Sequence, residues 1–97
     1  MSEPTNHEVL IGPKPFMNYV TRVVMEFTTQ NAESVTIKAR GKFVTKAVDT
    51  VEVVQKRFLQ DKIEKEHIET DSEEFTNQEG KKVRVSTITI VLKKVSE

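Results

Sequence analysis

The spacing between apolar residues changes repeatedly along this chain, and it limits the fold more than any other feature of the sequence. Apolar residues recur every three or four positions in two stretches, 16–27 and 44–58, and every second position in two others, 35–39 and 88–92. The longer spacing is typical of an amphipathic helix, and alternation is typical of a strand with one buried face. The sequence therefore predicts two helices interleaved with strands.

Glycine and proline residues set the expected boundaries of the first elements. A short apolar run at 9–11 indicates a strand, which must end at the Gly-Pro-Lys-Pro segment 12–15. We expect a helix that begins around Pro15 and Phe16 and ends at about Gln30, because proline suits the first turn of a helix. A strand then ends near Arg40, and a second helix is expected over 43–58.

The segment 62–70 has strand-like composition but an irregular alternation. Ile63 and Ile68 have opposite parity, so a straight strand cannot bury both side chains on one face. A β-bulge near Lys65 reconciles them, because it adds one residue to the strand. We therefore expect a bulged strand here.

Turn residues at 77–80 join this strand to a last one, expected at 83–92. The polar stretch from Ser72 to Arg84 around that turn is expected to form a long hairpin arm. The element order is then β-α-β-α-β-β. Such an order favours an α+β two-layer sandwich, in which two helices cover a four-stranded mixed sheet.

Length and composition limit the class of protein. The 97 residues suffice for one hydrophobic core, so we expect a single domain at 8–97 after a flexible N-terminal tail, 1–7. No apolar run approaches the roughly 18 residues that cross a bilayer, and the opening residues are polar, so we expect a cytoplasmic protein. The absence of cysteine excludes disulfides, thiolate metal sites and a cysteine nucleophile.

The charges balance overall but are unevenly placed. The sequence has 15 basic and 15 acidic residues, and this balance gives no support to a polyanionic partner. Segment 12–60 has eight Lys or Arg against four Asp or Glu, segment 61–79 has two against eight, and segment 80–97 has five against one. If these segments lie apart in the folded protein, its surface has separate basic and acidic regions. Runs of charged residues most often only keep a face of the protein solvated, which is the alternative.

The residues capable of catalysis or metal binding form no recognisable motif. His7 and His67 are far apart in the sequence, which gives no support to a metal site. His67, Asp71 and Ser72 are close in sequence, but alternate strand positions point to opposite faces and no nucleophile elbow surrounds the serine. The carboxylates of 64–74 are expected to be solvated and ordinary in acidity. We predict no enzyme, no cofactor and no metal.

Basic residues gather at three expected loops. Gly41 and Lys42 lie where a strand meets a helix, and backbone amides and the helix dipole attract phosphate at such a junction. A glycine that eases a turn and lysines that keep a helix soluble are the alternative explanation, but three basic loops together favour contacts with a phosphate backbone. The candidate contacts are Lys14, Arg40, Lys42, Lys46, Lys81, Lys82 and Arg84.

Six short segments form a distinctive set, and four of them contain candidate contacts named above. They are Gly12-Pro13-Lys14-Pro15-Phe16-Met17-Asn18-Tyr19-Val20, Ile37-Lys38-Ala39-Arg40-Gly41-Lys42, Lys46-Ala47-Val48-Asp49, Arg57-Phe58-Leu59, Glu79-Gly80-Lys81-Lys82 and Val85-Ser86-Thr87-Ile88. Together they resemble the signatures of the archaeal Alba family of DNA-binding proteins, over a span from Val9 to Lys94. The family's β-α-β-α-β-β fold agrees with the order expected from periodicity.

This resemblance implies a homodimer that coats and compacts chromosomal double-stranded DNA without sequence preference, and that also binds RNA. The positions that match the family's central grip on DNA are Lys14, Asn18, Arg40, Lys42 and Lys46, and those that match its minor-groove arms are Lys81, Lys82 and Arg84. Arg57 and Phe58 match the contact between neighbouring dimers on DNA. Burial of Phe58 in the core is the alternative.

Two features depart from the family's usual pattern. Members usually have two adjacent lysines in the first loop, the site of a regulatory acetylation, whereas Pro13 replaces one of them here. Lys14 is then the candidate for acetylation, and loss of that regulation is the alternative. Many members are basic, whereas this chain is neutral, which leaves open a main role in RNA binding or processing, or as a protein-interaction scaffold. A paralogue as heterodimer partner also stays open.

Overall fold

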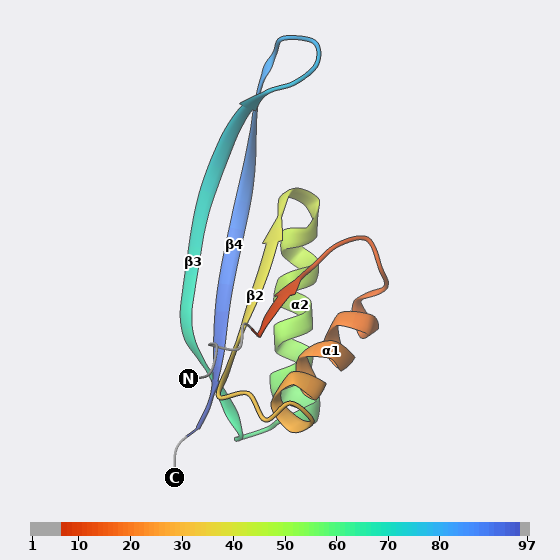
Figure 1. Cartoon of the computed structure of the whole chain (residues 1–97), viewed down its shortest axis with the longest axis vertical. Helices are drawn as coiled ribbons and strands as arrows, with labels where there is room; N and C mark the ends of the chain where they lie inside the picture. Colours follow the sequence, from red (N-terminus) through yellow and green to blue (C-terminus); the bar gives the residue numbers. More distant parts are fainter. Residues whose placement is uncertain (1–6, 96–97) are drawn as a thin grey trace, which may run out of the picture.

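Two helices lie on one face of a four-stranded sheet, from which a long hairpin projects (Figure 1). The computed structural model describes residues 7–95. Its elements are β1 (Glu8–Leu10), α1 (Phe16–Thr28), β2 (Ser34–Arg40), the 3-10 turn η1 (Gly41–Phe43), α2 (Val44–Val53), the π-helical turn η2 (Val54–Phe58), β3 (Ile63–Thr76) and β4 (Lys82–Lys94). The expected element order and α+β fold class are confirmed. In residues 7–95, no helix has the length and apolar character needed to span a membrane.

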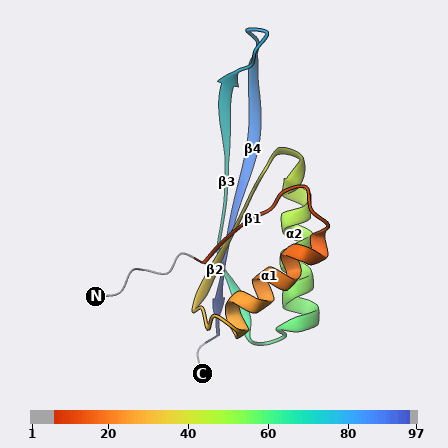
Figure 2. The same ribbon diagram turned by 45° about the vertical axis from the view of Figure 1, so that its right-hand side comes forward.

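The sheet is mixed, with the strand order β1-β2-β4-β3. β1 pairs with β2 in parallel, and α1 supplies the crossover between them. The pairs β2–β4 and β4–β3 are antiparallel. Both helices therefore lie over the same face (Figure 2), and the opposite face is left open.

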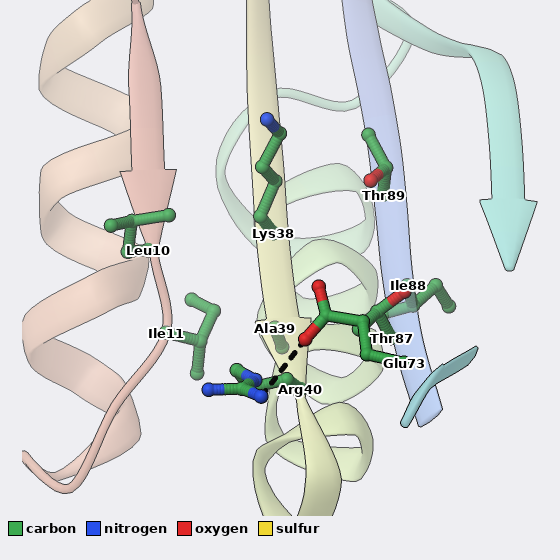
Figure 3. A pocket seen from close by; sticks show the side chains of 9 residues that line it. All are labelled: Leu10, Ile11, Lys38, Ala39, Arg40, Glu73, Thr87, Ile88 and Thr89. Carbon is green, nitrogen blue, oxygen red and sulfur yellow. Dashed lines mark hydrogen bonds and ion pairs between the residues drawn. The ribbon is translucent and has the colours of Figure 1, made fainter. Parts of the chain in front are cut away.

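The open face of the sheet is largely polar. Lys38 and Arg40 on β2 lie opposite Thr89 and Thr87 on β4, and these side chains are seen from the open side in Figure 3. Leu10 on β1 adds an exposed apolar side chain to the same face. The alternation of the sequence thus separates a solvated face from a buried one.

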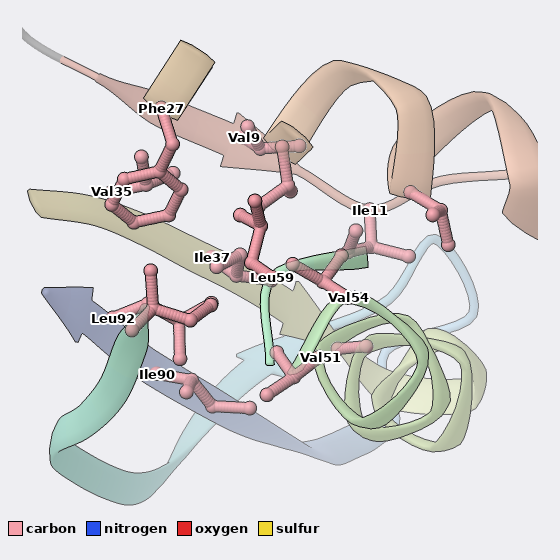
Figure 4. Close-up of a cluster of buried hydrophobic side chains, with 14 of the residues drawn as sticks. Val9, Ile11, Phe27, Val35, Ile37, Val51, Val54, Leu59, Ile90 and Leu92 are labelled. Atoms are coloured by element: carbon pink, nitrogen blue, oxygen red, sulfur yellow. The ribbon is translucent and has the colours of Figure 1, made fainter. Parts of the chain in front are cut away.

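The buried face and the two helices enclose one hydrophobic core (Figure 4). On the sheet side, the core consists of three cross-strand pairs between β2 and β4. On the other side, it consists of apolar residues from the two helical segments. These residues are Val35 with Leu92, Ile37 with Ile90, Ala39 with Ile88, and Val20, Val23, Phe27, Ala47, Val51 and Val54 above them. The strand residues alternate and the helix residues recur every three or four positions, as the sequence predicts. Burial of their apolar area therefore explains the register between β2 and β4.

The second helix differs from the continuous α-helix expected over 43–58. It begins with the η1 turn and ends in the π turn η2, where Leu59 N–H donates to Val54 O at 2.8 Å. This wider turn buries Leu59 and leaves Phe58 50% exposed. Val48, also expected on the buried stripe, lies at its edge and is 39% exposed.

The β-bulge expected near Lys65 is confirmed. Lys65 pairs with Leu92, and the register shifts before His67 pairs with Val91. The bulge returns Ile68 to the helix side of the sheet, opposite Ile90. Ile68 is nevertheless 52% exposed, because β3 is the edge strand and the helices leave it uncovered.

The hairpin arm is confirmed, and it is more regular than the sequence indicates. β3 and β4 stay paired up to Thr76 and Lys82, well beyond the helices (Figure 1). At the turn, Asn77 Oδ1 accepts hydrogen bonds from the N–H groups of Glu79 and Lys81, at 2.9 and 3.0 Å. Gly80 takes the left-handed conformation with φ of 82°, which suits glycine.

The described part of the chain begins at His7, the last residue of the tail expected at 1–7. Residues 1–6 of the predicted tail lie outside the described residues. His7, which we had assigned to that tail, has fixed contacts: its carbonyl accepts a hydrogen bond from Thr36 N–H, and its Nδ1 lies 2.5 Å from Glu26 Oε1. These contacts connect His7 with β2 and α1.

Candidate nucleic-acid interface

Lys46 of α2 binds the loop between β1 and α1. The Lys46 ammonium donates hydrogen bonds to the carbonyl oxygens of Gly12 and Lys14, both at 2.7 Å. It also lies 5.7 Å from the centre of the Tyr19 ring and 5.4 Å from that of Phe43. Lys46 is therefore directed into the protein rather than toward solvent.

Tyr19 makes a second contact to the same loop. Its hydroxyl accepts a hydrogen bond from Lys14 N–H at 3.2 Å. A Cβ atom at residue 12 would lie 3.3 Å from this hydroxyl, so glycine suits the close approach. Asn18 N–H donates to Pro15 O at 3.0 Å as α1 begins, and the Asn18 side chain is exposed. The loop presents the exposed Lys14 side chain at its tip.

The junction between β2 and α2 lies beside this loop. Gly41 has φ of 59°, which turns the chain from the strand into η1 and favours glycine. Lys42 is exposed, and its ammonium lies 5.6 Å from the centre of the Phe43 ring. The same ring faces Lys46, so Phe43 brings the Lys14 loop and the Lys42 junction together. These two loops form the centre of the candidate interface.

Arg40 is paired with an acidic residue of the arm. Its Nη2 donates to Glu73 Oε1 at 2.9 Å, and both side chains are 58% exposed (Figure 3). The pair borders a shallow depression on the open face of about 330 Å³. Sequence reasoning missed this ion pair, because the signal was only a run of acids whose register against β2 was unknown.

Three basic side chains lie near the far end of the arm and apart from the central loops. Lys81, Lys82 and Arg84 are all exposed. Lys82 and Arg84 belong to β4, where Arg84 lies opposite Glu74 of β3. The arm therefore carries both signs of charge. Its far end projects beyond the body of the domain (Figure 1).

Arg57 and Phe58 lie at the C-terminal end of the second helical segment, in η2. Both side chains are exposed, and Phe58 retains 50% of its surface. The alternative that Phe58 belongs to the core is therefore wrong in the isolated chain. An exposed aromatic next to an arginine is a typical protein-contact pair.

The acidic residues do not assemble a reactive centre in the part of the chain that the structure describes. No group of three or more His, Asp or Glu side chains within 7–95 has metal-binding geometry. His67 lies near Glu69, with Nε2 3.2 Å from Oε1, and both are exposed. Within 7–95, no hydrogen bond between side chains joins His67, Asp71 and Ser72; the backbone N–H of Ser72 donates to Oδ1 of the adjacent Asp71 at 2.7 Å.

Two carboxyl groups have lowered pKa values, and both lie outside the central loops. A hydrogen bond from Lys65 lowers the pKa of Glu52, against the opposing effect of burial. Burial alone would raise the pKa of Glu26, but hydrogen bonds from His7 and Arg22 outweigh burial and hold it below its ordinary value. These carboxylates link elements of the fold, so their role is structural.

The fold and the site define a class of protein: a small α+β sandwich with two adjacent cation-bearing loops and a projecting arm with exposed cations near its far end. A family model described as Alba matches residues 7–72. DNA/RNA-binding protein Alba from Methanocella arvoryzae is 45% identical over 91 residues, which cover 94% of this chain and 93% of that protein. The chain therefore belongs to the Alba family, a family of non-enzymatic nucleic-acid-binding proteins.

Two solved structures are similar to this one. Alba from Thermoplasma volcanium is 41% identical with a TM-score of 0.80, and the match covers 89% of this chain and 98% of that one. ALBA1 from Trypanosoma brucei is 20% identical with a TM-score of 0.71, and the match covers 97% of this chain and 74% of that one. The second likeness concerns the fold alone.

Proposed function

We propose that this chain binds double-stranded DNA without sequence preference, and also RNA, as a homodimer that coats and compacts the chromosome in the cytoplasm. The observation that carries the proposal is the placement of Lys14 and Lys42 on neighbouring loops around Phe43. Cations on loops contact phosphates, which carry no sequence information. The relative from Methanocella arvoryzae, named a DNA/RNA-binding protein, supports the same ligands.

The proposed roles of the site residues follow from their exposure and position. Lys14, Asn18, Arg40 and Lys42 contact the backbone at the centre, whereas the arm cations enter the minor groove. Lys14 is exposed at its loop tip, so it is also accessible to acetylation, which would remove its charge. Arg57 and Phe58 join neighbouring dimers along the DNA.

Uncovered apolar side chains support the homodimer. Ile68 on β3 and Val48 on α2 both belong to the helix side of the sheet, and they are 52% and 39% exposed. A second copy that covers this side would bury them and combine two central sites into one extended surface. Sedimentation should give a dimer at micromolar concentration, and a monomer alone at that concentration would refute the homodimer.

The decisive experiment is a competition between labelled duplex DNA and structured RNA at two salt concentrations. We expect retention of several unrelated duplexes with similar affinity, and weaker binding at higher salt because counterions are released from the phosphates. Failure to bind any duplex or RNA at low salt would refute the proposal. It would then favour the scaffold role.

A predominantly RNA-binding role is the second candidate, and the acidic strand β3 favours it. Glu73 competes for Arg40, and the chain has no net positive charge. Both features weaken attraction to phosphates, and this affects a regular duplex more than the unpaired loops of RNA, which proteins recognise largely through the bases. Displacement of bound DNA by a molar equivalent of structured RNA, with little reverse displacement, would identify RNA as the main ligand.

A further inference from the structure

Lys46 has surroundings unlike those of the other cations of the candidate interface. Lys14, Arg40 and Lys42 are exposed, whereas the Lys46 side chain is half-buried. Its ammonium has three protons, and two of them are used by the carbonyl oxygens of Gly12 and Lys14, at 2.7 Å each. The remaining surroundings include the rings of Tyr19 and Phe43.

These contacts connect segments that are far apart in the sequence. Lys46 belongs to the first turns of α2, and the carbonyls that it binds belong to the loop before α1. That loop includes Pro13 and Pro15, which lack N–H groups and cannot contribute backbone donors of their own. Lys14 N–H is used by the Tyr19 hydroxyl. The loop conformation therefore depends on Lys46 and Tyr19.

We infer that Lys46 is a positioning residue, which fixes the loop so that Lys14 faces the phosphate backbone, and that Lys46 itself contacts no phosphate. The inference rests on the proposed function. It departs from the role implied by the family resemblance, which places Lys46 among the residues that contact DNA directly. Two of the three ammonium protons are held by carbonyl groups to which no other described side chain donates, and the rings of Tyr19 and Phe43 lie beside the ammonium. Little room is left around the ammonium for a phosphate, and a move toward one would leave the two carbonyl groups unpaired.

The two roles predict different salt dependence. A lysine that neutralises a phosphate releases a counterion, so its loss reduces the magnitude of the salt slope by about one unit. A lysine that acts through the loop releases none. Its loss weakens binding by misplacing Lys14, while the number of neutralised phosphates in the complex is retained once the loop is ordered by DNA.

The test compares three variants of the full-length chain on a short duplex over a range of salt concentrations. Lys46→Met removes the donors and keeps the length of the side chain. Tyr19→Phe removes the hydroxyl that accepts Lys14 N–H without altering any charge. Lys14→Met is the matched control for the loss of one positive charge at the loop tip. Amide hydrogen exchange of residue 14 in the free protein gives a second readout, independent of nucleic acid.

For Lys46→Met we expect affinity to fall about tenfold, a free-energy change of about 1.4 kcal/mol, with the salt slope unchanged and amide exchange at Lys14 faster. Tyr19→Phe should show the same pattern with a smaller loss of affinity, and it keeps the test valid if Lys46→Met does not fold. Lys14→Met should reduce the salt slope by about one unit. Its loop backbone should stay as protected as in the wild type.

Two outcomes would overturn the inference, and they are distinguishable from failure of the proposed function. If Lys46→Met reduces the salt slope as Lys14→Met does, while amide exchange at Lys14 stays slow, Lys46 contacts phosphate directly. If affinity and exchange are both unchanged, Lys46 does not position the loop. Failure of the proposed function appears instead as absence of binding by the wild type, whatever amide exchange shows.

Discussion

The ion pair between Arg40 and Glu73 predicts that removal of an acidic residue strengthens DNA binding. Glu73 Oε1 accepts a hydrogen bond from Arg40 Nη2 at 2.9 Å in the free chain. A phosphate that binds Arg40 must displace this carboxylate or tolerate its negative charge nearby. Glu73→Gln removes the charge while it keeps the size of the side chain, so Arg40 becomes free to meet the phosphate.

The magnitude follows from the exposure of the pair. Both side chains are 58% exposed, and an ion pair of this kind contributes about 0.2 to 1 kcal/mol. Its release therefore predicts an increase in affinity of about 1.4-fold to fivefold. The salt slope should also become steeper, by less than about one unit, because Arg40 neutralises a phosphate more completely.

Fluorescence anisotropy with a short labelled duplex, at four or more salt concentrations, measures both quantities. Glu66→Gln is the matched control, because Glu66 lies on the same strand and faces Lys93 at 3.7 Å, which is no candidate contact. The control should change affinity less than Glu73→Gln. A loss of affinity in Glu73→Gln would refute the reasoning, because it would mean that Glu73 orients Arg40 for binding.

Three further predictions concern other parts of the chain. Lys14→Ala should weaken binding equally across unrelated duplexes, with a salt slope smaller by about one unit; an effect confined to one sequence in a binding panel would contradict it. Phe58→Ala should lower cooperativity on long DNA and shift thermal stability by less than about 1.5 kcal/mol, because the ring is half-exposed; a larger loss in the melt would contradict a surface role. Glu26→Gln should destabilise the fold at pH 7 by about 1 kcal/mol. The difference in unfolding free energy between variant and wild type should vanish as pH falls below the ordinary value of 4.5 and through the lowered pKa of Glu26. If chemical denaturation at pH 3 still shows this difference, the ionised form of Glu26 does not have the stabilising role assigned to it.

The sequence was sufficient to predict the layers of the fold, because burial imposes a period on each element. Ile37 and Ile90 are core residues at alternating positions, and their pairing in the sheet follows that pattern. The bulge near Lys65 was predictable for the same reason, since the parity of two isoleucines required it. The π turn was not, because an i to i+5 hydrogen bond leaves no characteristic spacing in one sequence.

The basic loops of the candidate interface were predictable from composition, but their internal contacts were not. Lys46 lies 32 residues from Lys14, and Arg40 lies 33 residues from Glu73. Such contacts depend on how two loops approach each other in space, and neither periodicity nor local charge determines that approach. A lysine that supports a loop and a lysine that meets solvent therefore look alike in the sequence.

The regular pairing of the arm makes its length adjustable in discrete steps. Each residue of a strand adds about 3.3 Å, so deletion of two residues from each strand would shorten the reach of the arm by about 7 Å. Because successive side chains alternate between faces, such a two-residue step preserves the side on which Lys82 and Arg84 project. A one-residue step in each strand would instead invert the arm and turn these cations to the opposite side. Changes in the reach of the arm that keep these cations on one side are thereby restricted to even changes in strand length.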